Sequence, residues 1–491
     1  MISRDASSLR YRARRVRPYV WEIPPDAKPG MLVPARILAS DELFKSMDDG
    51  VFDQVTNVAR LPGIQEYALC MPDGHWGYGF PIGGVAAFDP ESGVISPGGI
   101  GFDINCGMRL LRTNLTEEQV HPKLASLMDR LYELVPCGVG CSGVLRLSGA
   151  EYRDLMTSGA GWVVRRGYGR ADDLEHTEER GCIPGANPDK VSDRALKRGL
   201  DQLGTLGSGN HYLEVQVVRS ENIFDPVAAQ ALGIDRPNQI CVMIHCGSRG
   251  FGHQIATDYL KTFIPIMAKH GIRTNDKELA CCPFTEPEGK AYFAAMNCAA
   301  NSAFANRQMI THLIREGFSK TFGQNDIEIG LEVIYDVAHN IAKLERYEID
   351  GVKRQLLVHR KGATRSFGPG RGFLPEDYVA VGQPVIVGGS METGSYLLLG
   401  TDEAMNETFG STLHGSGRTM SRTKAKSMVR GEKLKESLLE RGIAIRAASL
   451  AGLAEEAGFA YKDISEVVNT VHDLGISRRV VRFLPIGNIK G

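Results

Sequence analysis

The 491-residue sequence lacks the long apolar segments of a membrane protein. No uncharged stretch reaches the roughly 18 residues that a membrane-spanning helix needs. The segment Met1 to Arg17 carries arginines but no apolar core, so no secretory signal is expected. We therefore interpret residues 1–32 as a basic N-terminal arm, and we expect no association with a membrane.

An excess of one charge and regularly spaced cysteines are missing as well. The formal net charge is -1, with 57 Lys and Arg against 58 Asp and Glu. Composition therefore indicates no polyanion partner, and any nucleic-acid site must be a local basic patch. The 10 cysteines are irregularly spaced and form no CxxC pair, a pattern that indicates reduced thiols in a cytoplasmic protein.

The common nucleotide-binding signatures are also absent. The sequence contains no GxxxxGK[ST] motif, and no GxGxxG motif lies between a predicted strand and helix with a following acidic residue. Neither a P-loop nor a Rossmann site is therefore indicated. No repeat of roughly 20 to 50 residues and no low-complexity linker divides the chain.

Glycine, in contrast, is abundant, with 56 residues gathered in clusters. Several clusters follow short aliphatic runs such as QICVMIH and QPVIVGG, which predict strands that lead into binding loops. The stretches GKAYFAAMNCAANSAFANRQMITHLIREG and GEKLKESLLERG predict helices. We expect one large α+β domain over residues 33–491, with β-sheets surrounded by helices and with the polar segment 158–198 as a surface insertion.

A candidate metal site begins with Asp103 and Cys106 in PGGIGFDINCGMR. Their side chains converge only if the backbone makes a tight or helical turn, and a lone Asp-x-x-Cys is more often a turn residue beside a buried thiol. Three later histidines, His211, His245 and His339, lie in segments that contain glycine or asparagine. Carboxylate, thiolate and imidazole together form a plausible ligand set for a transition metal, and this chemistry alone favours zinc.

A fourth histidine, His414 in STLHGSGRTMSR, lies between small residues and is followed by Arg418 and Arg422. A neutral imidazole with open space and nearby positive charge has what an acceptor of a phosphoryl or nucleotidyl group requires. A binding or structural role for this histidine is the alternative. The stretch HRKGATRSFGPGRG adds further basic residues beside glycines, namely Arg360, Lys361, Arg365 and Arg371.

Taken together, these motifs closely resemble the RtcB family of RNA-splicing ligases, in order from about Val33 to Gly491. The resemblance is carried by PDGHWGYGFPIGGVAAF, GVISPGGIGFDINCGMRLLRTNL, LGSGNHYLEV, IHCGSRGFG, DVAHNIAK, RKGATRSFGPG, GGSMETGSYLL, GSTLHGSGRTMSR and IGNIKG. It implies an RtcB-like fold and an enzyme that joins an RNA 3′-phosphate or 2′,3′-cyclic phosphate end to a 5′-hydroxyl end, in tRNA splicing and RNA repair. It also implies GTP as cosubstrate, two Mn²⁺ ions, tRNA halves or broken RNA as substrate, and an archease-type activator as a partner.

The resemblance also implies roles for single residues. Asp103 and His211 would hold one manganese, His245 and His339 the other, and the Cys106 thiolate would bridge them. His414 would attack the α-phosphorus of GTP and carry GMP. The guanylate site would be lined by Asn210, His211, Tyr212, Leu213, Glu214, His339, Asn340, Gly388, Gly389, Ser390, Met391, Ser395, His414, Gly415, Ser416, Gly417 and Lys490. Arg249, Lys361 and Arg422 would hold RNA or nucleotide phosphates.

Five positions depart from the family pattern without removing a ligand or the nucleophile: Gly74, Leu413, Ser416, Gly458 and Phe459. Two other functions remain open on the residues alone. One is a dinuclear-metal phosphodiesterase or phosphatase, in which His414 only binds phosphate. The other is a non-catalytic RNA-binding subunit, which would have no need of the complete set of metal-ligating side chains.

Overall fold

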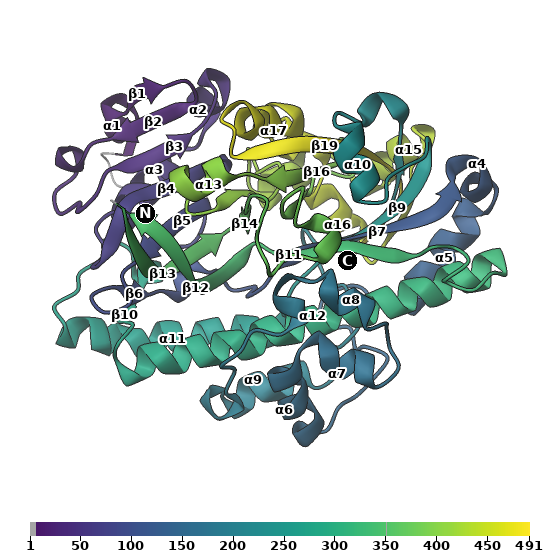
Figure 1. Ribbon diagram of the computed structural model, residues 1–491, viewed down its shortest axis with the longest axis horizontal. Coiled ribbons are helices and arrows are strands. Elements are labelled where there is room, and N and C mark those ends of the chain that lie inside the picture. Colours follow the sequence, from purple (N-terminus) through teal and green to yellow (C-terminus); the bar gives the residue numbers. More distant parts are fainter. Residues whose placement is uncertain (1–5, 350) are drawn as a thin grey trace.

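The computed structural model describes residues 6–349 and 351–491, and two β-sheets form its centre (Figure 1). The seven-stranded sheet has the spatial order β1 (Arg14–Arg17), β2 (Val20–Ile23), β3 (Ala35–Leu38), β4 (Ile64–His75), β5 (Ile82–Phe88), β13 (Val352–Lys361) and β12 (Asn340–Ile349). All neighbours in this sheet are antiparallel except β3 and β4, which run parallel.

The eight-stranded sheet has the order β11 (Glu332–Ala338), β7 (Gly107–Thr116), β9 (Gln239–Cys246), β8 (Tyr212–Val218), β19 (Ser477–Lys490), β16 (Ser395–Gly400) and β15 (Pro384–Val387). Its eighth strand, β18 (Ala444–Ala447), pairs with β19 in parallel. Two small ladders join β6 (Val94–Ile95) to β10 (Cys282–Pro283) and β14 (Ala363–Arg365) to β17 (Ser411–Leu413).

The middle of the eight-stranded sheet is built from strands that are buried on both faces. Every residue of β8 and β9 is buried, including the run QICVMIHC, in which apolar residues do not alternate with polar ones. Such continuous apolar runs are typical of strands covered on both sides. The strand expected before Gly247 is therefore confirmed, and it delivers His245 to the end of β9.

Helices cover these sheets (Figure 1). They are α1 (Ala6–Arg12), α2 (Asp41–Ser46), α3 (Asp49–Val58), α4 (Glu117–Val120), α5 (Leu124–Leu134), α6 (Gly149–Ser158), α7 (Ala160–Arg165), α8 (Asp172–Glu175), α9 (Asp193–Gly199), α10 (Pro226–Ala231), α11 (Arg249–Lys269), α12 (Pro287–Phe322), α13 (Asp402–Glu407), α14 (Arg422–Met428), α15 (Gly431–Glu440), α16 (Leu450–Glu455) and α17 (Ile464–Asp473). The expected helices in the two sequence stretches are confirmed as α12 and α15.

The long helix α12 connects the two halves of the molecule. It begins with a proline in its first turn and ends at Gly323, whose positive φ of 72° suits a residue without a Cβ. Its Phe304 packs in the apolar cluster beside the seven-stranded sheet, and its Ile314 packs in the cluster beside β7, β8 and β9. In Figure 1, α11 and α12 run alongside one another beneath both sheets.

The N-terminal region differs from the basic arm expected for residues 1–32. Residues 1–5 lie outside the described residues, but β1 and β2 extend the seven-stranded sheet through β3. Val20 and Ile23 are fully buried, so the ends of β2 point into the core. Two strands of four residues each are too short to give a clear alternating pattern in the sequence.

The polar segment 158–198 lies within a group of short helices below α12 (Figure 1). Buried ion pairs fasten this group to the rest of the chain. Asp173 pairs with Arg315 of α12 at 2.6 Å, and Glu178 pairs with Lys343 of β12 at 2.8 Å. The segment is therefore peripheral but firmly anchored, because removing one partner would leave a buried charge uncompensated.

The fold class expected from the sequence, a single large mixed α+β domain, is confirmed by these two sheets and their surrounding helices. Within residues 6–349 and 351–491, no helix combines the length and the hydropathy of a membrane crossing.

Candidate active site

A cavity of about 1190 Å³ lies where the two sheets meet. Its lining combines residues of both sheets, such as His75 at the end of β4, Lys361 at the end of β13, and Tyr212 and Lys490 of β8 and β19. Four of the five predicted metal ligands and His414 also line it. The cavity therefore contains most of the residues that the sequence singled out.

The strand register of the eight-stranded sheet brings the metal-ligand candidates to one edge. Gly107 lies opposite both Ala338 and Cys246, and Tyr212 lies opposite His245. Cys106, His211, His245 and His339 each adjoin or belong to one of these positions, so residues more than 200 positions apart in the chain become neighbours. Antiparallel pairing is thus the physical cause of the clustering.

The turn predicted for Asp103 and Cys106 is present. The Cys106 N–H donates to the Asp103 carbonyl at 3.0 Å, and Asn105 between them has a positive φ of 52°. A Cβ at Gly247 would lie 2.3 Å from the Asp103 Oδ1, so only glycine leaves room for this carboxylate.

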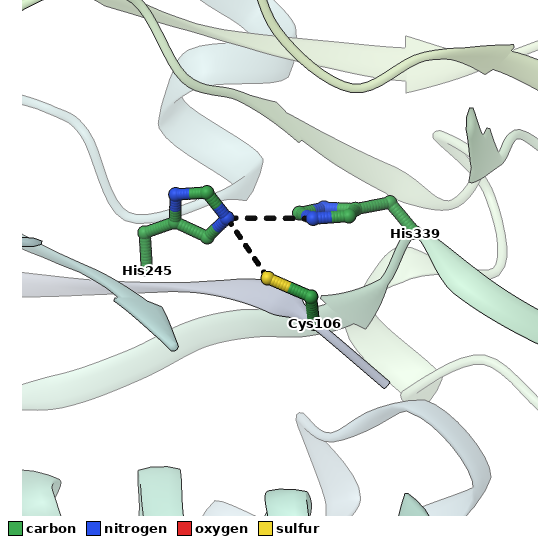
Figure 2. A group of neighbouring side chains, drawn as sticks. All are labelled: Cys106, His245 and His339. Atoms are coloured by element: carbon green, nitrogen blue, oxygen red, sulfur yellow. Dashed lines mark hydrogen bonds between the residues drawn. The ribbon is translucent and has the colours of Figure 1, made fainter. Parts of the chain in front are cut away.

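One group of possible ligands consists of Cys106, His245 and His339 (Figure 2). The His245 Nε2 lies 3.2 Å from the Cys106 Sγ and 3.4 Å from the His339 Nε2. Figure 2 shows both imidazoles and the thiol pointing toward a common space. All three side chains are buried, and their donor atoms face one another at the inner end of the cavity.

A second group consists of Asp103, Cys106 and His211. The His211 Nε2 lies 2.8 Å from the Asp103 Oδ2 and 3.4 Å from the Cys106 Sγ. Cys106 belongs to both groups, so its sulfur lies between the two sets of possible ligands.

Backbone carbonyls orient two of the imidazoles. The Nδ1 of His211 donates to the Leu206 carbonyl at 3.1 Å, and the Nδ1 of His245 donates to the Asn210 carbonyl at the same distance. A carbonyl can only accept, so each ring carries a proton on Nδ1, and the neutral ring of His245 can present its Nε2 lone pair to the cluster. The Nε2 of His211 instead faces Asp103, and although burial opposes it, the nearby Cys106, Cys246 and Asp103 raise the pKa of His211 well above its ordinary value.

The electrostatics of the cluster also suit a cation. Burial lowers the pKa of His245 and of His339 well below the ordinary value, which keeps both rings neutral and able to bind metal. Burial raises the pKa of Cys106 to about 12, so its thiol ionises near neutral pH only beside a cation. Burial opposes ionisation of Asp103, yet the adjacent His211 lowers the pKa of this carboxyl to about 2.

A buried arginine of α12 supports the loops that carry these ligands. Arg307 Nη1 donates to the carbonyls of Asn105 and Cys246, each at 2.8 Å. The same guanidinium pairs with Asp336 at 2.8 Å, and all of these groups are fully buried. Because Asn105 precedes Cys106 and Cys246 follows His245, Arg307 fixes the spacing between two ligand-bearing segments.

His414 lies beside the cluster, with its ring centroid 4.8 Å from that of His339. Its Nδ1 lies 2.6 Å from the Oδ2 of Asp73, which also accepts the backbone N–H groups of His414 and Gly415. Burial opposes ionisation of Asp73, but the ring and the backbone of His414 lower the pKa of this carboxyl and keep the carboxyl ionised. An ionised carboxylate only accepts, so Nδ1 carries a proton, and in the neutral ring the lone pair is on Nε2.

Most of the predicted guanylate-site residues share the same cavity. Those that line it are Asn210, Tyr212, His339, Asn340, Gly388, Gly389, Ser390, Met391, His414, Gly415, Ser416, Gly417 and Lys490. His211 instead faces the metal-ligand cluster, and the Leu213 side chain packs in the apolar core.

Two predicted guanine contacts, Glu214 and Ser395, lie one layer behind the cavity wall. The Glu214 carboxylate accepts hydrogen bonds from Asn488, which lines the cavity, and from Gln216, each at 2.6 Å. Gln216 also donates to the Ser395 hydroxyl at 3.3 Å. Burial raises the pKa of Glu214 to about 7.

The three residues predicted to hold phosphates differ in position. Lys361 lines the cavity, but its Nζ donates to the Tyr78 and Phe80 carbonyls at 2.7 and 3.0 Å. Arg422 also lines the cavity and donates to Glu456 at 2.8 Å. Arg249 donates to Thr205 at 3.2 Å and lies outside the cavity lining, close enough to Asp103 to help lower the pKa of that carboxyl.

Sequence reasoning missed Asp73, Arg307 and Gln216 as functional candidates. Asp73 lies in the motif PDGH, so an acidic residue beside a glycine at a strand end was a visible signal. Its partner His414 is 341 positions away, and no spacing rule connects the two. Arg307 carries a full charge inside the predicted helix, which is unusual for a buried position.

Comparison with known proteins gives consistent matches along the chain. The family described as tRNA-splicing ligase RtcB matches residues 54–491. A protein of Archaeoglobus fulgidus named tRNA-splicing ligase RtcB is 52% identical over 478 residues, covering 97% of this chain and 98% of its own length. Proteins with the same name from Pyrobaculum aerophilum and Aeropyrum pernix are 52% and 53% identical, each covering 97% of this chain and 99% of its own length.

Proposed function

The chain belongs to the RtcB family and is an RNA ligase, and we propose that it joins an RNA 3′-phosphate or 2′,3′-cyclic phosphate end to a 5′-hydroxyl end through a histidine–GMP intermediate. GTP is the proposed cosubstrate, and the proposed substrates are tRNA halves or broken RNA ends. We also propose that a partner protein of the archease type activates turnover of the ligase. A cytoplasmic location is supported by the ten free cysteines.

Two Mn²⁺ ions are the proposed metals. Asp103 and His211 would hold one ion, His245 and His339 the other, and Cys106 would bridge them. The donor set fits, because the Nε2 atoms of His245 and His339 lie 3.4 Å apart beside the Cys106 thiol, and both neutral rings would offer a lone pair to a cation. Manganese is proposed from family membership, since thiolate and imidazole ligands alone favour zinc. When bound, the ions supply charge neutralisation and orientation for phosphate groups.

His414 is the proposed nucleophile. Its Nε2 lone pair forms a bond to the α-phosphorus of GTP while the bond from that phosphorus to the β-bridging oxygen breaks, and pyrophosphate leaves with the electron pair. The Nδ1 proton stays in place, so the ring becomes cationic, and the Asp73 carboxylate at 2.6 Å stabilises that charge. Asp73 thus positions the ring and favours the tautomer that can attack.

The later steps follow from the leaving groups. A 3′-phosphate is a poor electrophile because attack on it must expel a strongly basic oxygen. Transfer of GMP from His414 to the 3′-phosphate restores the free ring and creates a phosphoanhydride. The 5′-hydroxyl then attacks the 3′-phosphorus, loses its proton, and GMP departs as a weakly basic leaving group. A 2′,3′-cyclic phosphate is first opened by water to the 3′-phosphate.

The guanine specificity is proposed to rest on Glu214 and Ser395. An ionised carboxylate accepts hydrogen bonds from the N1–H and N2–H groups of guanine, which adenine cannot offer. To reach the base, Glu214 would exchange its bond from Asn488, the residue that separates it from the cavity. Lys490 lines the cavity near this position and would face the phosphates or ribose.

The observation that carries this proposal is the pairing of His414 with Asp73 next to the metal-ligand cluster. Incubation with GTP labelled at the α-phosphate and manganese is expected to leave acid-labile label on the protein. The His414→Ala variant is expected to take up none, and the label is expected to move to an RNA that ends in a 3′-phosphate. Hydrolysis of phosphate esters without any protein label would instead support a dinuclear-metal phosphodiesterase.

A further inference from the structure

Exposed aromatic rings mark one side of the cavity rim. Trp76 and Tyr78 line the cavity, yet 46% and 57% of their surface is exposed. Phe102, also in the lining, is partly exposed and directly precedes the ligand candidate Asp103. Large aromatic side chains are costly to leave in water, so their position at the rim calls for an explanation.

The backbone that carries Trp76 and Tyr78 is held firmly. Gln54 of α3 clamps Gly77 between them, because its Nε2 donates to the Gly77 carbonyl at 2.5 Å and its Oε1 accepts the Gly77 N–H at 3.1 Å. Lys361 donates to the Tyr78 and Phe80 carbonyls. Both clamping side chains are buried, so the loop is rigid while the two rings extend outward.

Two of the three rings, Tyr78 and Phe102, are in contact, and the contact continues to a histidine of α11. Tyr78 meets Phe102 edge to face, with ring centroids 5.6 Å apart. Phe102 in turn stacks on His253 of α11, with centroids 4.9 Å apart and ring planes inclined by 26°. Aromatic surfaces arranged in this way offer faces and edges to further rings.

Positive charge borders this row. Arg198 at the end of α9 is exposed, and within residues 6–349 and 351–491 it has no ion pair or hydrogen bond through its side chain. Its Cδ would lie 3.9 Å from a Cβ at Gly250 in the first turn of α11, and burial together with the Arg198 charge lowers the pKa of the neighbouring His253. A cation beside aromatic faces is the combination that binds single-stranded nucleic acid.

We propose that Trp76, Tyr78 and Phe102 form a stacking platform for the unpaired RNA bases that flank the break. This inference rests on the proposed function, because the RNA ends must pass the rim to reach His414. Every base has a π-face, so a platform of this kind accepts any sequence but requires unstacked, single-stranded ends. The platform therefore selects RNA by its strandedness at the break, and not by its sequence.

The direct test uses RNA that carries 2-aminopurine, whose fluorescence is quenched by stacking. The probe is placed either as the last base before the 3′-phosphate or as the first base after the 5′-hydroxyl, and RNA is bound with manganese but without GTP. The wild-type protein is expected to quench at least one probe. The Trp76→Ala/Tyr78→Ala variant is expected to leave that probe bright, whereas Trp76→Phe and Tyr78→Phe keep the quenching.

Ligation kinetics supply a second readout. Each alanine substitution is expected to raise KM for RNA by roughly tenfold, with a smaller change in kcat. RNA with abasic nucleotides on both sides of the break should weaken the wild type equally and weaken the double variant no further. Tyr11→Ala is the matched control, because Tyr11 is 86% exposed and lies outside the cavity lining.

Self-labelling by GTP separates failure of this inference from failure of the proposed function. Labelling needs no RNA, so the double variant is expected to label within about twofold of the wild type. If labelling and ligation are normal in the double variant, or if neither probe is quenched by the wild-type protein, the stacking platform is overturned while the ligase function stands. If no protein labels, the proposed function itself fails.

Discussion

Two regions of the cavity differ in how their side chains are held: the floor, formed by the five candidate metal ligands, and the rim, formed by the exposed aromatic residues. At the floor, Asp103, Cys106, His211, His245 and His339 are held by strand register, carbonyl contacts and the buried guanidinium of Arg307. At the rim, Trp76, Tyr78 and Arg198 are exposed, and side chains of Gln54 and Lys361 fix the backbone beneath the two rings. The difference separates chemistry, which needs fixed distances, from recognition, which needs accessible surface.

The comparison predicts that substitutions at the floor impair guanylylation, whereas substitutions at the rim impair only steps that involve RNA. The largest expected effect is that of Asp73→Asn. The amide keeps the volume of Asp73 but cannot hold the proton on His414 Nδ1 in the same way, nor balance the charge of the cationic ring. The rate of self-labelling by GTP is expected to fall by roughly 10³-fold. A normal labelling rate would show that the contact at 2.6 Å plays no part in the reaction.

Arg307→Met tests the support of the floor. The substitution removes one of the two arginines that pair with Asp336, since Arg109 remains, and it removes the Arg307 donor from the carbonyls of Asn105 and Cys246. A loss of about 3 kcal/mol in unfolding free energy is expected, together with weaker metal binding. Urea denaturation and metal analysis of the purified protein check both effects, and Arg166→Met on the surface serves as control.

Glu214, which lies behind the cavity wall, is expected to give guanylylation a pH dependence. Its pKa is raised to about 7 by burial, so the carboxyl is ionised above that pH and protonated below it. Because only the ionised form accepts both guanine hydrogens, KM for GTP in self-labelling is expected to rise by up to about tenfold per pH unit below pH 7. Glu214→Gln is expected to weaken GTP binding and remove this dependence. Persistence of the same pH profile in that variant would exclude Glu214 as its source.

Arg422→Ala is expected to have the smallest effect. Arg422 is about half exposed and shares Glu456 with Arg418, so its loss costs little stability. KM for RNA should rise several-fold. The slope of log affinity for RNA against log salt concentration should become smaller in magnitude by about 1. Self-labelling by GTP should be unchanged. A variant that loses labelling but keeps its RNA affinity would place Arg422 at the nucleotide instead.

Local patterns in the sequence predicted local structure well. Continuous apolar runs predicted buried strands such as β9, and a stretch without interior glycine or proline predicted α12. The turn between Asp103 and Cys106 was also predicted, because only a turn brings the two side chains together. The strands within residues 1–32 were missed, since four-residue segments carry too little pattern.

The site itself was predictable only as a set of candidates. Nothing local connects Asp73 to His414, or Arg307 to the carbonyls of Asn105 and Cys246, because these contacts arise from sheet register and helix packing. Lys361 illustrates the opposite case: its basic side chain resembled a phosphate ligand, but it is committed to two backbone carbonyls. Burial and competing partners decide such roles, and neither is visible in the chain alone.

The central claim is that His414 is covalently guanylylated beside a two-metal cluster. The most direct measurement is peptide mapping by mass spectrometry of the protein after incubation with GTP and manganese, in parallel with metal analysis. We predict one GMP attached to His414 in protein that holds two manganese ions. GMP on another residue, or metal-loaded protein that carries no GMP at all, would contradict the account.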